Sequence, residues 1–353
     1  MSSASRTAWV RLLDERLRSG RSALLSGRVA WVGGGLIEAC VSDVVVGQLC
    51  DIEVGAGSVR AEVVGVEGER ARLLPWGSAE GVGVGARVRV RRTPGGRMRV
   101  EEALGRVLDG LGEPIDGGAA VARLPDAPLA GFLRRSVSVA DRFETGVAGL
   151  DALAPIGRGA RVAVIGEAGS GKTYLLRQLR ERMSEDVVVI GLVGERAREA
   201  SALVAEVFGG PLSARTTVVV ASSEAAASER VAAAELAAEL ADGWRGRGHS
   251  CLLLLDSLTR YARALREVAQ VRGEPMSASG FPVTMGSSMA RLLEKAGAGL
   301  EGSVTGIYSV LSSSEAEQGW SRRRCGVWWM FSWCCAVVWR IEVSSPRWIG
   351  WRA

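Results

Sequence analysis

The residues with the clearest chemical potential lie in Arg161–Thr173, where an apolar run ends at a glycine-rich turn that carries a lysine and a threonine. Gly166, Gly171, Lys172 and Thr173 fit the pattern G-x-x-x-x-G-K-[ST], in which backbone N–H groups converge on phosphate oxygens. Lys172 would add a positive charge at the β- and γ-phosphates, Thr173 a hydroxyl for Mg²⁺, and the helix N-terminus a favourable dipole. The pattern predicts a phosphate-binding loop rather than a glycine-rich turn of purely structural use.

A phosphate loop needs a buried strand before it and a helix after it, and the chain offers both. Val162–Ile165 is predicted as the strand and Tyr174–Met183 as the helix. Beyond the loop, predicted strands and helices alternate: Val187–Val193 and a helix from Ala197, Thr216–Ala221 and Glu224–Ala241, Ser250–Asp256 and Ser257–Ala269. This alternation predicts an α/β fold with a mostly parallel sheet, in which ligands bind at the carboxyl ends of the strands.

Two carboxylates follow predicted strands. Asp256 comes after a run of four leucines, where a charge is costly unless it meets a cation, so it is a candidate Walker B ligand of Mg²⁺. The alternative role for Asp256 is to cap the next helix. Glu195, in the run GERARE, is placed to orient or deprotonate an attacking water, with a surface ion pair to Arg196 or Arg198 as the alternative.

The N-terminal part of the chain has a different pattern. Residues 27–92 contain short Val-rich runs separated by glycines, which predict a small antiparallel β-barrel of about five or six strands. The runs are Arg28–Val32, Ala39–Val46, Ser58–Val64, Arg70–Leu74 and Ala86–Val90. Before them, Trp9, Leu12, Leu13 and Leu17 are spaced as in an amphipathic helix, which would dock a partner or pack on its own barrel. We see no signal peptide and expect a cytoplasmic protein.

Composition sets the remaining bounds. The 353 residues, 47% apolar and 24% charged, are ordinary for a globular chain of two domains. The net charge of +5 resides in residues 320–353, which hold six arginines and one glutamate, so it does not indicate a nucleic-acid partner for the rest of the chain. The six cysteines have no paired CxxC spacing, which favours free thiols over a metal site or a disulfide framework.

Longer motifs carry a resemblance to a known family. GRVLDGLGEPIDG from Gly105 and the run from Glu144 to the phosphate loop resemble the rotary-ATPase family. GEAGSGKT, VGERARE, DSLTRYARALREV and GSVTGIYSVL together look most like the type III secretion ATPases, flagellar and injectisome, which are relatives of the ATP synthase β subunit. The resemblance covers residues 1 to about 319. It implies a RecA-like P-loop domain behind a small N-terminal β-barrel, and ATP hydrolysis that energises protein export.

The resemblance also implies site residues and partners. Its catalytic positions match Lys172, Glu195, Arg196 and Asp256, with Thr173 and Asp256 on the metal. Its nucleotide-binding positions match Gly166, Glu167, Ala168, Gly169, Ser170, Gly171, Lys172, Thr173, Tyr174 and Tyr308. ATP and Mg²⁺ are the implied cofactors, and the implied assembly is a homo-hexamer. The implied partners are export-apparatus regulator or stalk proteins and export substrates or chaperones, at the inner membrane only indirectly and without nucleic acid.

The sequence departs from the family in two places. Val283–Met289 replaces the family's proline-rich stretch, which affects expected subunit contacts rather than the chemistry. From Trp320 the resemblance stops, and the last 34 residues contain seven of the eleven tryptophans. Cys325–Trp339 is uncharged for fifteen residues, fewer than the about 20 that a membrane span needs.

A change of reading frame would explain this tail. Ser321–Met330 can be written with one permitted choice of codons, and these nucleotides can then be read in the frame that starts one nucleotide earlier. The result is V-A-A-E-V-R-S-L-V-D, which resembles the family's continuation. We hypothesise a slip near Gly319. The predicted organisation is therefore a helix at residues 1–26, a barrel at 27–97, an incomplete ATPase domain at 98–319 and an aberrant tail at 320–353. The arginine finger, the adenine-facing segment and the C-terminal helical domain are expected to be absent, and the chain to be poorly soluble and impaired in turnover.

Two other function classes remain open at this point. A Rho-like hexameric RNA translocase would use the same core, but it predicts a basic, aromatic barrel, whereas residues 27–92 include only Trp31 and Trp76 as aromatics. A non-catalytic remnant would bind nucleotide or partners without turnover, because an intact phosphate loop would lack an arginine finger in trans.

Overall fold

The structure is a computed structural model that describes residues 26–91, 98–123, 141–167, 170–182, 185–210, 213–278, 280–311, 337–345 and 348–352. The predicted N-terminal helix with Trp9 and Leu17 lies outside the described residues. The chain divides after residue 93 into two compact units. Among the described residues, no helix is both long and apolar enough to cross a membrane.

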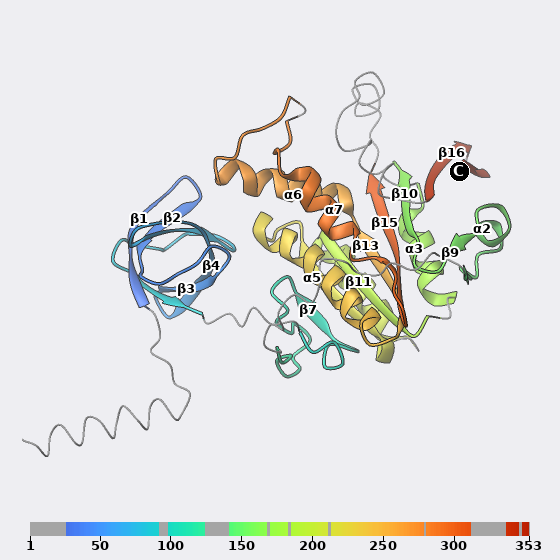
Figure 1. Ribbon diagram of the computed structural model, residues 1–353, viewed down its shortest axis with the longest axis horizontal. Coiled ribbons are helices and arrows are strands. Elements are labelled where there is room, and N and C mark those ends of the chain that lie inside the picture. Colours follow the sequence, from blue (N-terminus) through green and yellow to red (C-terminus); the bar gives the residue numbers. More distant parts are fainter. Residues whose placement is uncertain are drawn as a thin grey trace, which may run out of the picture. The chain divides into compact units, whose positions relative to one another are not determined.

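The first unit is a closed six-stranded barrel, which confirms the predicted architecture (Figure 1). Its strands are β1 (Ser26–Gly33), β2 (Leu36–Cys40), β3 (Leu49–Val54), β4 (Gly57–Glu67), β5 (Arg70–Pro75) and β6 (Arg87–Val90). Neighbours around the barrel, in the order β1-β2-β5-β4-β3-β6, are antiparallel. Alternating side chains point inward, so that Ile37, Ile52 and Leu73 are fully buried in one core.

The strand predicted at Ala39–Val46 is wrong. The structure ends β2 at Cys40 and gives Asp43 a φ of +57°, a left-handed conformation that interrupts an extended chain. Val45 is accordingly 67% exposed in a loop. The strand that the prediction missed is β3 (Leu49–Val54), in which Cys50 and Ile52 face the core and alternate with the charged Asp51 and Glu53.

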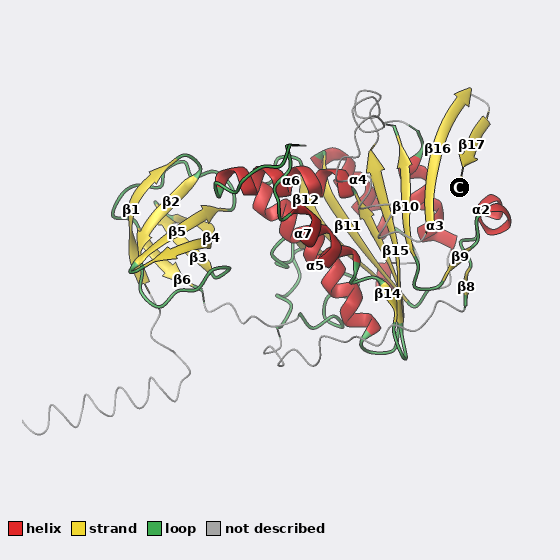
Figure 2. Ribbon diagram, turned by 45° about the horizontal axis from the view of Figure 1, so that its top comes forward, coloured by secondary structure: helices red, strands yellow, loops and turns green. Residues whose placement is uncertain are grey.

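The second unit is built on a nine-stranded sheet flanked by helices, which confirms the predicted α/β, RecA-like P-loop class (Figure 2). Its strands are β7 (Val107–Asp109), β10 (Arg161–Gly166), β11 (Val187–Glu195), β12 (Thr216–Ser222), β13 (Ser250–Asp256), β14 (Gly297–Ala298), β15 (Ser303–Leu311), β16 (Val337–Ser345) and β17 (Trp348–Arg352). The order is β17-β16-β10-β15-β13-β11-β12-β7, with β14 beside β15. From β16 to β7 neighbouring strands are parallel. The strand β16 from the tryptophan-rich tail therefore lies beside β10.

The helices divide into two groups on the two faces of this sheet. The helices are α2 (Ala148–Leu153), α3 (Lys172–Arg182), α4 (Ala197–Phe208), α5 (Ala227–Arg245), α6 (Leu258–Val271) and α7 (Met285–Leu293), with a 3₁₀ turn at Ser213–Arg215 and a small hairpin of β8 (Arg142–Phe143) and β9 (Ile156–Gly157). Helices α5, α6 and α7 share a core with Val189 and Leu253, whereas α3 and α4 share the opposite core with Ile190 and Leu254 (Figure 2). Successive strand residues thus face opposite cores, as the strand period of two requires.

The motif that starts at Gly105 contains β7, the outermost strand at one side of the sheet, and the turn that packs against α5. Asp109 ends β7, and its Oδ1 accepts hydrogen bonds of 2.8 Å from the backbone N–H groups of Leu111 and Glu113. Gly110 lies against α5, because a Cβ at this position would stand 2.5 Å from the carbonyl oxygen of Glu229. The glycine therefore permits a close approach between the turn and the helix backbone.

Gly110→Ala should destabilise the second unit by about 1–3 kcal/mol, since a helix carbonyl cannot yield as a side chain can. Urea unfolding measures the change. Gly149→Ala is the matched control: nothing lies within 4 Å of its added Cβ, so it should be neutral or stabilise α2 by up to about 1 kcal/mol. Equal stability of the two variants would contradict this account of the turn.

Candidate functional site

The phosphate-loop motif, Glu195 and Asp256 lie at the carboxyl ends of parallel strands of the sheet. Strand β10 ends at Gly166, β11 at Glu195 and β13 at Asp256, and all three strands run parallel. In the sheet the order β10-β15-β13-β11 separates the phosphate loop from Glu195 by two strands. Because parallel strands end on the same side, the loop and both carboxylates face a common region.

Lys172 is held by the loop that carries it. Its Nζ donates hydrogen bonds to the carbonyl oxygens of Gly166, at 2.7 Å, and Glu167, at 2.5 Å, and to Oγ of Ser170, at 3.2 Å. The residue is only 6% exposed. Gly171, which precedes it, has a φ of +89°, a conformation that favours glycine. Helix α3 then begins at Lys172. The loop thus wraps its described backbone around an ammonium group.

The charge on Lys172 sits in a balanced environment. Burial lowers the pKa of the lysine, while the nearby carboxylates of Asp256, Glu167 and Glu195 act to raise that pKa. Surrounding negative charge therefore favours the protonated form of the lysine. A triphosphate beside it would supply further negative charge and favour the protonated form.

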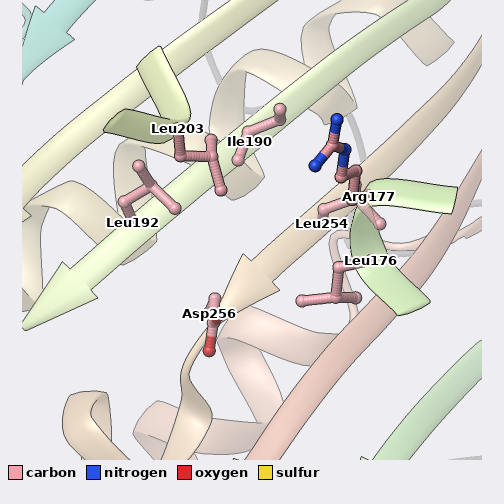
Figure 3. Close-up of a pocket in the computed structure, with 7 residues that line it drawn as sticks. All are labelled: Leu176, Arg177, Ile190, Leu192, Leu203, Leu254 and Asp256. Carbon is pink, nitrogen blue, oxygen red and sulfur yellow. The ribbon is translucent and has the colours of Figure 1, made fainter. Parts of the chain in front are cut away.

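Asp256 is a buried carboxylate at the tip of β13 (Figure 3). It is 8% exposed and accepts a hydrogen bond from the hydroxyl of Ser309 on β15. The alternative role as a helix cap falls to its neighbour: Ser257 is the N-cap of α6, and its side chain accepts from the backbone N–H of Arg260 at 3.4 Å. The Asp256 carboxylate therefore does not cap α6 and remains available at the carboxyl end of β13.

Glu195 ends β11 and points away from its sequence neighbours. Its carboxylate pairs with the guanidinium of Arg260 and not with Arg196. The side chain of Arg196 is 83% exposed, and its Nη1 lies 3.9 Å from Oε1 of Glu199. Burial raises the pKa of Glu195 to about 7, helped by a hydrogen bond with Glu199 and by the charge of Asp256, and opposed by Arg260. A carboxyl group that titrates near neutral pH is suited to general base catalysis.

Two small cavities lie on the α3 and α4 face of the sheet beside these carboxylates. One, of about 20 Å³, is lined by Asp256 and Arg177 among the apolar side chains of Leu176, Ile190, Leu192, Leu203 and Leu254 (Figure 3). The other, of about 90 Å³, is lined by Glu195, Glu199 and Asp256 together with Leu192, Ala200 and Leu203. The second cavity places three carboxylates around one space that water can enter.

The structure places two predicted residues apart from this cluster. Tyr308 is fully buried in the core of the α5, α6 and α7 face, and its ring lies over Gly306, where a Cβ would stand 2.5 Å from the tyrosine hydroxyl. Tyr174 is 65% exposed on α3. Ala168, Gly169 and the side chain of Thr173 lie outside the described residues.

Three polar contacts of the site were not predicted from the sequence. Arg260 contacts Glu195, Glu199 shares the cavity with it, and Ser309 donates to Asp256. Arg260 had an available signal, because it follows Asp256 by four residues in the first turn of the next helix. An arginine in the first turn of a helix can extend back to the carboxyl end of the strand that precedes that helix.

The donor set fits a magnesium ion. Mg²⁺ prefers hard oxygen ligands and is bound by one or two carboxylates together with substrate phosphates. Asp256 offers such a carboxylate at the buried strand end, and Thr173 is the loop residue whose hydroxyl would join it. These two residues would hold the ion, beside the phosphates that Lys172 would bind.

Comparisons with known proteins agree with this geometry. The model of the ATP synthase alpha/beta family, nucleotide-binding domain, matches residues 146–318. A type 3 secretion system ATPase of Pseudomonas savastanoi pv. phaseolicola is 36% identical over 327 residues, which are 89% of this chain and 72% of the relative. A flagellum-specific ATP synthase of Salmonella typhimurium is 34% identical over 337 residues, which are 88% of this chain and 73% of the relative.

A solved structure extends the similarity to the fold. The assembled ATPase EscN from the enteropathogenic E. coli type III secretion system superposes with a TM-score of 0.75 at 29% sequence identity. The match covers 90% of this chain and 76% of that chain. The similarity therefore includes both the barrel and the P-loop unit.

Lys172→Ala should abolish nucleotide binding, because it removes the cation at the phosphates and the group around which the loop is closed. Binding of a fluorescent ATP analogue measures this. The chain has two lysines, and Lys295→Ala is the matched control, since Lys295 pairs with Asp242 at 3.8 Å. Equal affinity of the Lys172→Ala variant and the parent chain would show that the site is elsewhere.

Proposed function

The chain belongs to the family of type III secretion and flagellum-specific ATPases, and on that premise we propose that it hydrolyses Mg-ATP at the Lys172, Glu195 and Asp256 site to energise protein export. The identity of 36% over 89% of the chain supports the family. The matched nucleotide-binding domain supports ATP as the substrate.

One observation carries the proposal: a buried lysine and two carboxylates meet at the carboxyl ends of parallel strands. Lys172 and Asp256 are both largely removed from water, although isolated buried charges are costly. Glu195 is held beside Asp256 at a shared cavity. A phosphate binder, a metal ligand and a base in one place are the parts that ATP hydrolysis requires.

Each residue has a role that its position allows. Lys172 exchanges its loop carbonyl partners for the β- and γ-phosphate oxygens, and the backbone N–H groups of the loop bind the remaining oxygens. Glu195 orients the attacking water and accepts its proton. Asp256 and Thr173 would hold Mg²⁺, which when bound would neutralise developing phosphate charge. Arg196, exposed at the start of α4, exchanges its ion pair with Glu199 for contact with the phosphates.

We extend the proposal to assembly and location. A homo-hexamer is the proposed active form, supported by the solved relative, which is described as an assembled ATPase. The proposed partners are regulator or stalk proteins of the export apparatus and export substrates or their chaperones. The proposed place of action is the cytoplasmic side of the inner membrane, at the secretion apparatus, through protein contacts.

The barrel does not favour the RNA translocase. Arg89 pairs with Glu53 at 2.5 Å, and Arg91 pairs with Asp51 at 2.6 Å. These arginines already have carboxylate partners, whereas a strand-binding groove needs cations that face the backbone phosphates. Protein export remains the function that the observations support.

Glu195→Gln should bind Mg-ATP as the parent does but hydrolyse it about 10²–10⁴-fold more slowly, because an amide cannot accept the proton. Phosphate release measures turnover. With the pKa of Glu195 raised to about 7, turnover of the parent should rise as pH increases through 7, since the base must be ionised, and the variant should lack this step.

Glu224→Gln, in an exposed turn before α5, is the control and should change neither rate nor profile. Unchanged turnover in Glu195→Gln would assign the base to another carboxylate. A parent chain that binds ATP but shows no turnover would identify it as the non-catalytic remnant considered above.

A further inference from the structure

Arg260 makes a contact that links two elements of the site. It lies in the first turn of α6, directly after the strand that carries Asp256, and its guanidinium pairs with the Glu195 carboxylate at the end of β11. Both side chains are mostly shielded from solvent. A shielded charge pair fixes its two members more firmly than an exposed one, because water competes less with the contact.

The backbone of β11 is shaped to accept this arginine. The pairing register with β12 shifts between Val193 and Glu195, so the strand carries an irregularity just before the glutamate. Gly194, within it, has a φ of +72°, and a Cβ there would stand 3.0 Å from Cδ of Arg260 and 3.2 Å from its Cβ. The glycine thus makes room for the arginine stem, while the irregularity re-aims the residue that follows.

The surroundings explain why Glu195 needs such a partner. Glu195, Glu199 and Asp256 line one cavity of about 90 Å³, where the charge of Asp256 opposes ionisation of Glu195 and Glu199 shares a hydrogen bond with it. Lys172 is bonded to loop carbonyl oxygens and reaches Glu195 only by its longer-range charge. In the part of the chain that the structure describes, Arg260 is the cation that pairs directly with Glu195.

We propose that Arg260 is a positioning residue that acts through Glu195, holding its carboxylate at the cavity shared with Asp256 against the charge of that aspartate. The inference rests on the proposed function, in which Glu195 is the base. It predicts that loss of the arginine charge impairs turnover by misplacing Glu195, and that the loss has no further effect once the Glu195 carboxylate has been removed.

A kinetic double-mutant cycle on the full chain tests this. Arg260→Met keeps an unbranched stem and removes the charge; it should lower kcat by about 10–100-fold and change KM less than about threefold, as expected for a misplaced catalytic group. In the Glu195→Gln background the same change should leave kcat unaltered. Arg260→Lys should restore part of the lost rate. An equal loss of kcat in both backgrounds would overturn the proposal, because it would show that Arg260 acts independently of Glu195.

Arg230→Met is the matched control, because Arg230 on α5 is also largely buried and pairs with Glu267 on α6 at 2.5 Å. It should resemble Arg260→Met in its effect on stability but leave kcat and KM unchanged. If Arg230→Met lowers kcat as much as Arg260→Met, the effect comes from helix packing and the proposal fails.

A second readout does not need turnover. A water-soluble carbodiimide modifies accessible, protonated carboxyl groups, and peptide mass spectrometry locates the modification. In the nucleotide-free chain, Arg260→Met should increase labelling of Glu195 severalfold relative to the exposed Glu224, whereas Arg230→Met should not. Unchanged labelling of Glu195 overturns the inference. A parent chain without ATP turnover contradicts the proposed function alone, and the labelling result then decides the role of Arg260.

Discussion

The structure of the site depends on keeping charges at the end of a parallel sheet largely out of water. Lys172 and Asp256 are nearly buried, and a buried ion is tolerated only when other groups bind it. Loop carbonyls bind the lysine, and the Ser309 hydroxyl binds the aspartate. Parallel pairing of β10, β15 and β13 sets the distances among these groups, so the chemistry relies on the register of the sheet.

The two faces of the sheet have different packing and different uses. On one face, α5 buries ten of its residues against the strands. On the other, α4 buries only Ala200 and Val207, and two cavities lie beneath it and α3 beside Asp256. A helix with few buried contacts moves at lower cost than a well-packed one. Helix α4, which follows Glu195, is therefore the less tightly packed of the two helices.

Much of this arrangement could be predicted from local patterns. The glycine spacing around Lys172, the apolar strand before Asp256 and the change between strand and helix periods all lie within short windows. Two contacts could not be predicted in this way: Glu195 with Arg260, and Asp256 with Ser309. The two residues of each contact are more than fifty positions apart in the sequence, and the order of strands in the sheet brings them together. In the barrel, the valines before Gly47 suggested a strand, but the backbone at Asp43 turns the chain away.

Other predictions concerned residues for which composition is a poor guide. The resemblance assigns Tyr308 to the nucleotide, and this assignment stays a prediction; in the structure the alternation along β15 places the tyrosine in the core on the α5, α6 and α7 face. Residues 337–345 come from a tail whose composition suggested no fold, yet their backbone pairs in parallel with β10 over four residues. Pairing depends on the main chain, which composition does not report. The frame hypothesis for the tail stays a prediction, which resequencing of the gene tests.

The central claim is that Lys172 and Asp256 act on one Mg-ATP at the strand ends, and the most direct measurement is ATP affinity with magnesium and with EDTA, in the parent and in Asp256→Asn. Asparagine keeps the shape and can still accept from Ser309, but it lacks the charge that a metal requires. The account predicts that magnesium tightens binding at least about tenfold in the parent and has little effect in the variant, with equal affinities in EDTA. The same magnesium dependence in both proteins would contradict it.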